Sequence, residues 1–134
     1  MEHEVKMYFA IMGFEESPHA ITEQVGIQPT KTWLKGETIQ NTAIRRKNNG
    51  WELSSSVPGN SSFDAHLKAI AVTLRSKEVK VGEICRKYEG QLSCAVYISV
   101  SSENSLPAIS FDHETIDLFA RIGAEINCEL YLVP

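Results

Sequence analysis

Alternating apolar and polar positions predict three main strands in this chain. Residues 5–12 place apolar side chains at every second position, and the same period of two recurs in 92–100 and in 125–132. Successive side chains of a strand point to opposite faces of its sheet, so each segment is expected to turn one apolar face toward a core. Residues 30–35 are predicted to be extended as well, because Pro29 precedes them and Gly36 follows.

A helical period predicts the segments that connect these strands. Residues 63–74 show the clearest pattern, with apolar side chains recurring at i, i+4, i+7, i+8 and i+11. Further helices are expected over 81–88 and over 112–122, where Asp112 is a favourable N-cap. A short helix follows Ser17-Pro18, because serine is a good N-cap and proline fits the first helical position.

Turn residues predict the remaining connections. Residues 38–47 and 51–57 are expected to form the two arms of a hairpin with Asn49-Gly50 near its tip, since Asn-Gly tolerates the positive φ angles of a tight turn. The Ser-, Pro-, Gly- and Asn-rich segment 54–62 is expected to be a loop. Residues 108–111 are predicted to be a short strand after a polar loop.

These elements together predict one α+β domain over residues 1–134. The expected architecture is a two-layer sandwich of ferredoxin-like character, in which helices cover one face of a mixed, mainly antiparallel sheet. An internal strand-helix-strand pseudo-repeat is a further expectation. In each half a helix ends at a glycine and a strand follows, at Val25-Gly26-Ile27 and at Ile122-Gly123-Ala124.

Composition narrows the class of protein without indicating a chemistry. The 134 residues are 43% hydrophobic and 22% charged, which excludes collagen-like, disordered and membrane-spanning chains. Thirteen Lys+Arg against seventeen Asp+Glu give a net charge of -4, whereas nucleic-acid binding would favour an excess of positive charge. Neither nucleic acid nor a membrane is therefore the expected partner.

Three cysteines and an acidic start predict a cytoplasmic protein. Met1-Glu2-His3-Glu4 lacks the basic start of a secretory signal. The odd number of cysteines favours free thiols in a reducing compartment. All three are expected on apolar sides of their elements, where a thiol is an inert packing residue: Cys85, Cys94 and Cys128.

Two tryptophans and a histidine are candidate binding residues. Trp33 and Trp51 lie on consecutive extended segments, so their rings are expected to approach each other across the sheet. Such a pair is usually a packing element, but one that lined an open groove would be the best place for a ligand or partner. His66, at the edge of its apolar stripe, has two interpretations: a general base or partner-holding group, or a structural hydrogen bond between layers.

A basic run supplies the remaining candidates. Arg45, Arg46 and Lys47 follow Lys31 and Lys35 and have tryptophans as neighbours. They could therefore form a basic-aromatic surface for a phosphate, an acidic peptide or a nucleic-acid strand. Adjacent charges cannot all project to one face of a strand, which favours a solvated hairpin instead. The candidate ligand- or partner-binding residues are Trp33, Lys35, Arg45, Arg46, Trp51 and His66.

No catalytic or metal-binding signature is found. The chain has no G-x-S-x-G, no P-loop and no G-x-G-x-x-G. His113 and Asp117 share a helical face, but a zinc site needs three or four ligands. No catalytic residue, metal or cofactor is therefore predicted, and the sequence favours a protein that is not an enzyme.

The order of several short motifs resembles a family of small bacterial proteins that is catalogued only as a domain of unknown function. The resemblance covers nearly the whole chain and rests on F-x-I-x-G (Phe9, Ile11, Gly13), G-I-x-P (Gly26, Ile27, Pro29), W-x-x-G (Trp33 to Gly36), W-x-L (Trp51 to Leu53), D-x-H-L (Asp64, His66, Leu67) and R-I-G-A (Arg121 to Ala124). It implies a single-domain α+β protein and brings no catalytic residues.

Two functional hypotheses follow, and nucleic-acid binding ranks third behind them. The first is a non-catalytic protein-interaction module, with a toxin or a neighbouring gene product as partner; an immunity protein that neutralises a toxin is its specific form. The alternative is a small-molecule-binding domain or an uncommon enzyme with a groove near Trp33, Trp51 and His66. The sequence leaves the oligomeric state open.

Overall fold

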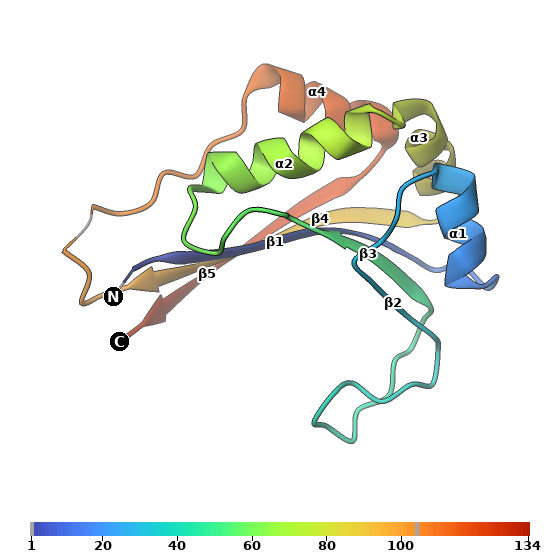
Figure 1. Cartoon of the computed structure of the whole chain (residues 1–134), viewed down its shortest axis with the longest axis horizontal. Coiled ribbons are helices and arrows are strands. Elements are labelled where there is room, and N and C mark those ends of the chain that lie inside the picture. Colours follow the sequence, from blue (N-terminus) through green and yellow to red (C-terminus); the bar gives the residue numbers. More distant parts are fainter. Residues whose placement is uncertain (1, 104) are drawn as a thin grey trace.

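The period-two segments form one sheet, and the helices cover one of its faces (Figure 1). The computed structural model describes residues 2–103 and 105–134, and over these residues it contains five strands and four helices. The strands are β1 (Glu4–Met12), β2 (Lys31–Trp33), β3 (Gly50–Ser54), β4 (Glu89–Ser99) and β5 (Glu125–Val133). The helices are α1 (Pro18–Val25), α2 (Phe63–Arg75), α3 (Glu78–Lys87) and α4 (His113–Ile122). The predicted two-layer α+β architecture is confirmed.

The sheet is mixed and mainly antiparallel, with the strand order β2-β3-β1-β4-β5. β1 lies in the centre and runs antiparallel to both β3 and β4, whereas β4 and β5 are parallel. A parallel pair needs a crossover connection, and α4 provides it. The ferredoxin-like character of the architecture stays a prediction.

The two strand-helix-strand segments share their helix ends but not their place in the sheet. Gly26 and Gly123 both adopt the left-handed conformation at φ 74°, so each helix ends as expected. β1 and β2 are separated by β3, however, whereas β4 and β5 are direct neighbours. The pseudo-repeat is therefore visible in the local caps and absent from the strand pairing of the described residues.

The core lies between the helices and one face of the sheet. The apolar positions of β1 are buried there, as the alternation predicts, and the apolar stripe of α2 packs on the same layer. Phe9 of β1 contacts Phe119 of α4, with ring centroids 6.4 Å apart. Each such side chain contributes about 1.5–3 kcal/mol to stability when it is fully buried.

The predicted hairpin of 38–47 with 51–57 is wrong. β3 pairs instead with β2, with Trp33 opposite Gly50 and Lys31 opposite Glu52. Residues 34–49 form a long loop that extends beyond the sheet (Figure 1), with one isolated bridge between Thr38 and Arg45.

Asn49 explains why this turn differs from the expectation. Its side-chain oxygen accepts a hydrogen bond from the Lys35 backbone N–H at 2.7 Å, and its amide donates to the Phe14 carbonyl at 3.1 Å. Asn49 therefore ties together three distant segments at the base of the loop. A side chain with this role cannot lie at the tip of a hairpin.

Two further expectations near the C-terminus are wrong. Residues 108–111 form no strand, because Phe111 packs edge-on against Phe63, with centroids 5.4 Å apart, in place of strand pairing.

Cys85 and Cys94 are buried as expected, and burial raises the pKa of the Cys85 thiol to about 12. Cys128 is exposed, because the helix layer leaves the apolar side of β5 uncovered.

The contact between Trp33 and Gly50 yields a test of the β2–β3 register. A Cβ at position 50 would lie 1.9 and 2.0 Å from atoms of the Trp33 ring. Gly50→Ala is therefore expected to lower the free energy of unfolding by roughly 1–3 kcal/mol in urea denaturation, because the ring must move.

Gly82→Ala is the matched control. A Cβ at position 82 would meet first the flexible end of Arg86, at 3.2 Å, and alanine is favoured over glycine in a helix by about 1 kcal/mol. We expect this variant to be as stable as the wild type or more so. Equal stability of Gly50→Ala and the wild type would contradict the packing of Trp33 on Gly50.

Candidate functional site

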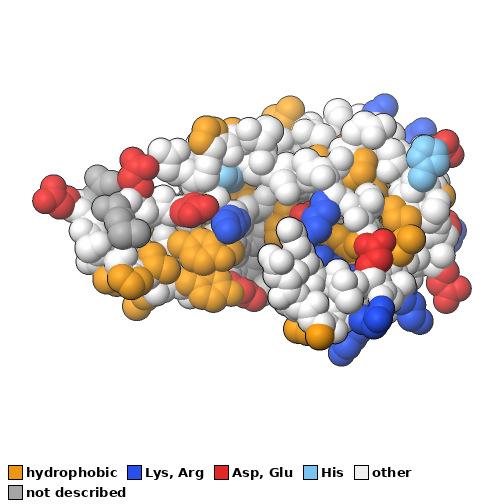
Figure 2. All heavy atoms as spheres, turned by 60° about the horizontal axis from the view of Figure 1, so that its bottom comes forward, with side chains coloured by type: hydrophobic (Ala, Val, Ile, Leu, Met, Phe, Trp, Pro, Cys, Tyr) orange, Lys and Arg blue, Asp and Glu red, His pale blue; other side chains and the backbone are white. Residues whose placement is uncertain are grey.

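The face of the sheet that the helices leave open carries the main cavity of the described residues. Alternate side chains of the strands point to this side, and together with the projecting loop they enclose about 520 Å³. Figure 2 brings this face forward and shows it hollowed beside the loop. The volume lies within the range of about 300–1,000 Å³ that is typical of small-molecule sites. The lining residues are Tyr8, Ala10, Met12, Lys31, Trp33, Arg46, Glu52, Gln91, Ser93, Cys94, Ala95, Asn127 and Glu129.

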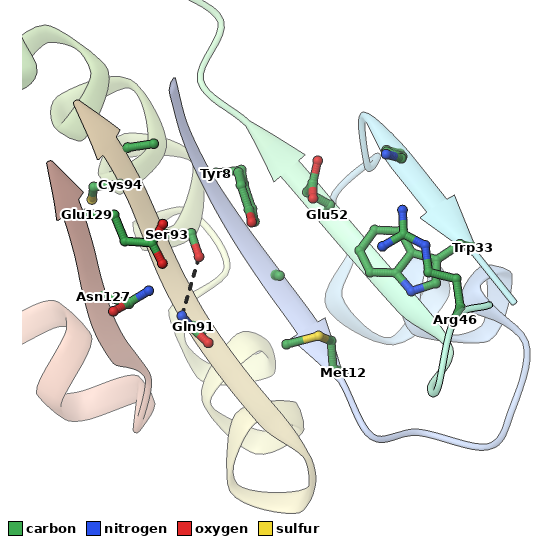
Figure 3. A pocket seen from close by; sticks show the side chains of 13 residues that line it. Tyr8, Met12, Trp33, Arg46, Glu52, Gln91, Ser93, Cys94, Asn127 and Glu129 are labelled. Atoms are coloured by element: carbon green, nitrogen blue, oxygen red, sulfur yellow. Dashed lines mark hydrogen bonds between the residues drawn. The ribbon is translucent and has the colours of Figure 1, made fainter. Parts of the chain in front are cut away.

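Trp33 and Arg46 form one wall of this cavity (Figure 3). The Arg46 guanidinium carbon lies 4.2 Å from the centroid of the Trp33 ring, and the Lys31 ammonium lies 5.7 Å from it. Trp33 is only 8% exposed, because its ring is held against Gly50. A guanidinium stacked on a fixed indole loses much of its freedom, so Arg46 is preoriented to hydrogen-bond an anion.

Glu52 lies beside these two cations. The strand register places it opposite Lys31, and its side chain is half-buried at the edge of the cavity. Burial raises the pKa of the Glu52 carboxyl, and the charges of Lys31 and Arg46 partly oppose that rise. This wall therefore combines two positive groups with one carboxyl group.

The opposite wall comes from β4 and β5 and is polar with a single charge (Figure 3). Gln91 donates a hydrogen bond from its amide to the Ser93 hydroxyl at 3.4 Å. Asn127 adds a second amide, and Glu129 adds a carboxylate that accepts a hydrogen bond from the Tyr131 hydroxyl. These groups can donate to and accept from a polar ligand that bridges the two walls.

The two tryptophans do not approach each other, contrary to the expectation. Trp51 lies opposite Thr32, so it points to the face of the sheet opposite to that of Trp33. It is fully buried among the helices, and its indole N–H donates to the Thr22 hydroxyl at 3.0 Å. Trp51 is a core residue, and Trp33 alone reaches the cavity.

The basic run is divided between roles. Arg46 faces the cavity, whereas Arg45 donates a hydrogen bond to the Gly36 carbonyl at 2.8 Å and so closes the loop on itself. Lys35 lines a separate hollow of about 380 Å³ with Phe14 and Asn49. Of the basic residues singled out as candidates, only Arg46 therefore belongs to the main cavity.

His66 joins α2 to the segment that follows β3. Its Nδ1 lies 2.7 Å from the Ser55 hydroxyl, which in turn accepts a hydrogen bond from the Val57 N–H at 3.4 Å. The tautomer of the ring decides which of the two atoms, Nδ1 or the Ser55 oxygen, is the donor. His66 borders a neighbouring hollow of about 360 Å³ that shares Tyr8 and Glu52 with the main cavity.

The surroundings of the His66 ring favour the structural interpretation. Nε2 is buried and forms no hydrogen bond of good geometry with the described residues. Burial lowers the pKa of His66, while the backbone of Gly59 and Pro58 acts in the opposite direction. The neutral ring therefore holds the loop after β3 against α2.

Sequence reasoning missed Glu52 and the polar residues of the far wall. Gln91, Ser93 and Asn127 occupy polar positions of β4 and β5, whereas the period of two predicts a core only from the apolar positions. The same alternation places them together on the open face once the strand order is known. The sequence therefore shows which side chains are polar, but it does not show which strands are neighbours.

Neither a metal-binding cluster nor a membrane-spanning helix occurs within residues 2–103 and 105–134. The side chains of this part of the chain include no group of three or more His, Cys, Asp and Glu residues that is placed to hold a metal ion. None of its helices combines the length and the apolar character that a membrane span requires.

The lowered pKa of His66 predicts a dependence of stability on pH. The unfolded chain binds a proton on this residue near pH 6.5, whereas the folded chain binds it only at lower pH. The contribution of His66 to the free energy of unfolding is therefore complete above about pH 6.5. It is lost as the pH falls from that value toward the lower pKa of the folded state.

We expect the urea midpoint of the wild type to decrease as the pH is lowered from about 7.5 to about 5.5. In His66→Asn the urea midpoint should depend less on pH, because this titrating group is gone. His19→Asn is the control, because the side chain of His19 is 78% exposed. A slope that survives in His66→Asn would contradict this assignment.

Comparison with known proteins gives a family and no function. A family model described as a domain of unknown function (DUF4279) matches residues 3–133. No curated protein and no solved structure matches the chain. The resemblance to a family of unknown function that the motifs indicate is thus confirmed. Because the match spans nearly the whole chain, the protein belongs to the DUF4279 family.

Proposed function

We propose that this protein is a non-catalytic binding module that takes a small polar molecule bearing a carboxylate or phosphate on the open face of its sheet. The observation that carries the proposal is the Arg46 guanidinium, stacked 4.2 Å from the Trp33 ring centroid at the wall of a cavity of about 520 Å³.

The charge of this wall favours an anion. Lys31 and Arg46 are both positive, and Glu52 offsets only one of them. Arginine presents a planar fork that matches a carboxylate or phosphate with two hydrogen bonds. The indole limits the motion of that fork, so less conformational entropy is lost when the ligand binds.

The far wall suits the uncharged or amino-bearing end of such a ligand. Ser93 and Asn127 offer both donors and acceptors, and Glu129 offers a carboxylate. The ligand is therefore expected to be polar at both ends, with its anionic group on the side of β2 and the loop.

Binding without turnover is favoured by the kinds of residues in the cavity. The Ser93 hydroxyl accepts a hydrogen bond from Gln91, and no histidine is among the residues that line this cavity in the described part of the chain. Activation of a serine nucleophile needs a base within hydrogen-bond reach. His66 contacts Ser55 and borders the neighbouring hollow.

A protein-interaction module, including a toxin-neutralising one, is the second candidate function. The observation that favours it is the loop 34–49, which projects beyond the sheet (Figure 1). On this loop Leu34 and Ile44 expose 48% and 62% of their surface. A protein partner would contact this loop and place a side chain in the cavity. Loops carried on a rigid sheet are common binding elements.

The first test measures the binding of small anions. Binding is monitored by the indole N–H signals of the tryptophans in NMR spectra. With inorganic phosphate, glutamate and citrate as probes, we expect the Trp33 signal to shift and the signal of buried Trp51 to stay. Arg46→Gln should weaken binding roughly 10- to 100-fold, because a hydrogen bond to a charged group contributes about 1.5–3 kcal/mol.

Arg45→Gln is the control for this measurement, since Arg45 bonds within the loop and does not line the cavity. It should bind the same anions as the wild type does. The proposal is wrong if none of these anions shifts the Trp33 signal, or if Arg46→Gln binds as tightly as Arg45→Gln.

The second candidate is tested at the tip of the loop. Ile44→Ser removes an exposed apolar side chain that lies outside the cavity lining. It is expected to weaken capture of the purified neighbouring gene product if a protein is the ligand, and to leave anion binding unchanged. Capture that is equal for Ile44→Ser and the wild type would count against the loop as a protein contact.

A further inference from the structure

The apolar side of β5 faces the helix layer but is not covered by it. Ile126, Leu130 and Leu132 lie opposite Leu92, Val96 and Ile98 of β4 and share their face of the sheet. Leu92 and Val96 are fully buried, whereas Ile126, Leu130 and Leu132 are 39%, 58% and 74% exposed. The core therefore ends between β4 and β5.

The position of α4 explains this boundary. One side of the helix is buried over the sheet, and Arg121 on its flank bonds to Glu78 of α3 at 2.7 and 3.0 Å. Helical spacing places Ile116 and Ala120 on the opposite flank, away from α3, and both are exposed. We define the β5 surface as Ile116, Ala120, Ile126, Cys128, Leu130 and Leu132.

β5 is also one edge of the sheet, and of the usual edge protections it has only two charged side chains, Glu125 and Glu129. β5 lies at one end of the strand order, and among the described residues it pairs with β4 alone. Exposed edges are normally protected by lysine, proline or short length. The nine residues of β5 include no Lys, Arg or Pro, whereas β2 at the other edge has three residues, one of them Lys31.

We propose that a second copy of this chain covers the β5 surface. In the dimer the two β5 strands pair antiparallel about a twofold axis, so that one sheet continues through both protomers and the two α4 helices meet above it. A twofold interface needs a surface that complements itself. The β5 surface meets this condition, because its residues are uncharged and apolar.

The size of the surface is adequate for a stable dimer. A nine-residue strand is about 30 Å long, and the sheet and helix layers together are roughly 20 Å deep, so the edge presents on the order of 600 Å². Standard interfaces bury roughly 600–1,000 Å² per partner, so this edge lies at the lower end of that range.

The acidic residues of β5 exclude one register of this pairing. Glu125 and Glu129 point to the open face, and a register with Glu129 on the axis would place two carboxylates opposite each other. With Leu130 on the axis, Glu129 instead lies opposite Tyr131 of the partner subunit. On the helix side, Leu130 then meets Leu130 of the partner subunit, and apolar contacts continue along both strands.

Light scattering during size-exclusion chromatography tests this proposal on the full chain. The wild type is expected at twice the chain mass, and Leu130→Lys at one chain mass, because a charge would be buried at the axis. Val79→Lys is the matched control: Val79 is 72% exposed on α3, outside the β5 surface, so this variant should remain a dimer.

Leu130 is exposed in the single chain, so its replacement should leave the fold intact, as the circular dichroism spectrum will show. Ile116→Lys, on α4, is a second variant and should also be a single chain. The proposal is overturned if the wild type is a single chain at all concentrations, or if both variants remain dimers. If both variants remained dimers, the dimer would use another face of the protein. If the wild type were a single chain, the β5 surface would be open to a different protein.

Discussion

One layer of helices covers one face of a five-stranded sheet, and it does not reach the last strand. This constraint organises the rest of the molecule. On the covered face, the apolar positions of β1 and β4 pack beneath the helices, and Trp51 joins them. On the uncovered face, the side chains must tolerate water, and these are the polar residues that line the cavity. At β5, apolar side chains that cannot be covered within one chain are left exposed.

The candidate site depends on how one aromatic ring is held. Trp33 is on the uncovered face, yet it is nearly buried, because it lies on Gly50 on one side and has Arg46 near its ring. The indole therefore serves as a support for a cation and as a wall of the cavity. Glu52 moderates the positive charge there, and its raised pKa reflects the same partial burial. The proposed preference for an anion follows from this local balance and not from the net charge of -4.

Periodicity predicted much of the fold and little of the site. The strand of 5–12, the helix of 63–74 and the glycine caps at Gly26 and Gly123 are local patterns, and the structure has them. Asn49 was misassigned, because its bonds to Lys35 and Phe14 join segments distant in sequence. The sequence leaves two roles open for His66, and its contact with Ser55 together with its burial favours the structural one.

The sequence by itself determined which side chains share a face of each strand, because side chains alternate with a period of two whatever the strand's neighbours are. It therefore separated the apolar positions of β1, β4 and β5 from the polar ones. Only the tertiary structure decided which strands are neighbours and in what register. A shift of one residue reverses the face, so the pairing of Thr32 with Trp51 sends one tryptophan to the core and leaves Trp33 at the cavity. The position of α4 likewise decided that the apolar side of β5 is exposed, because burial depends on what packs above a strand.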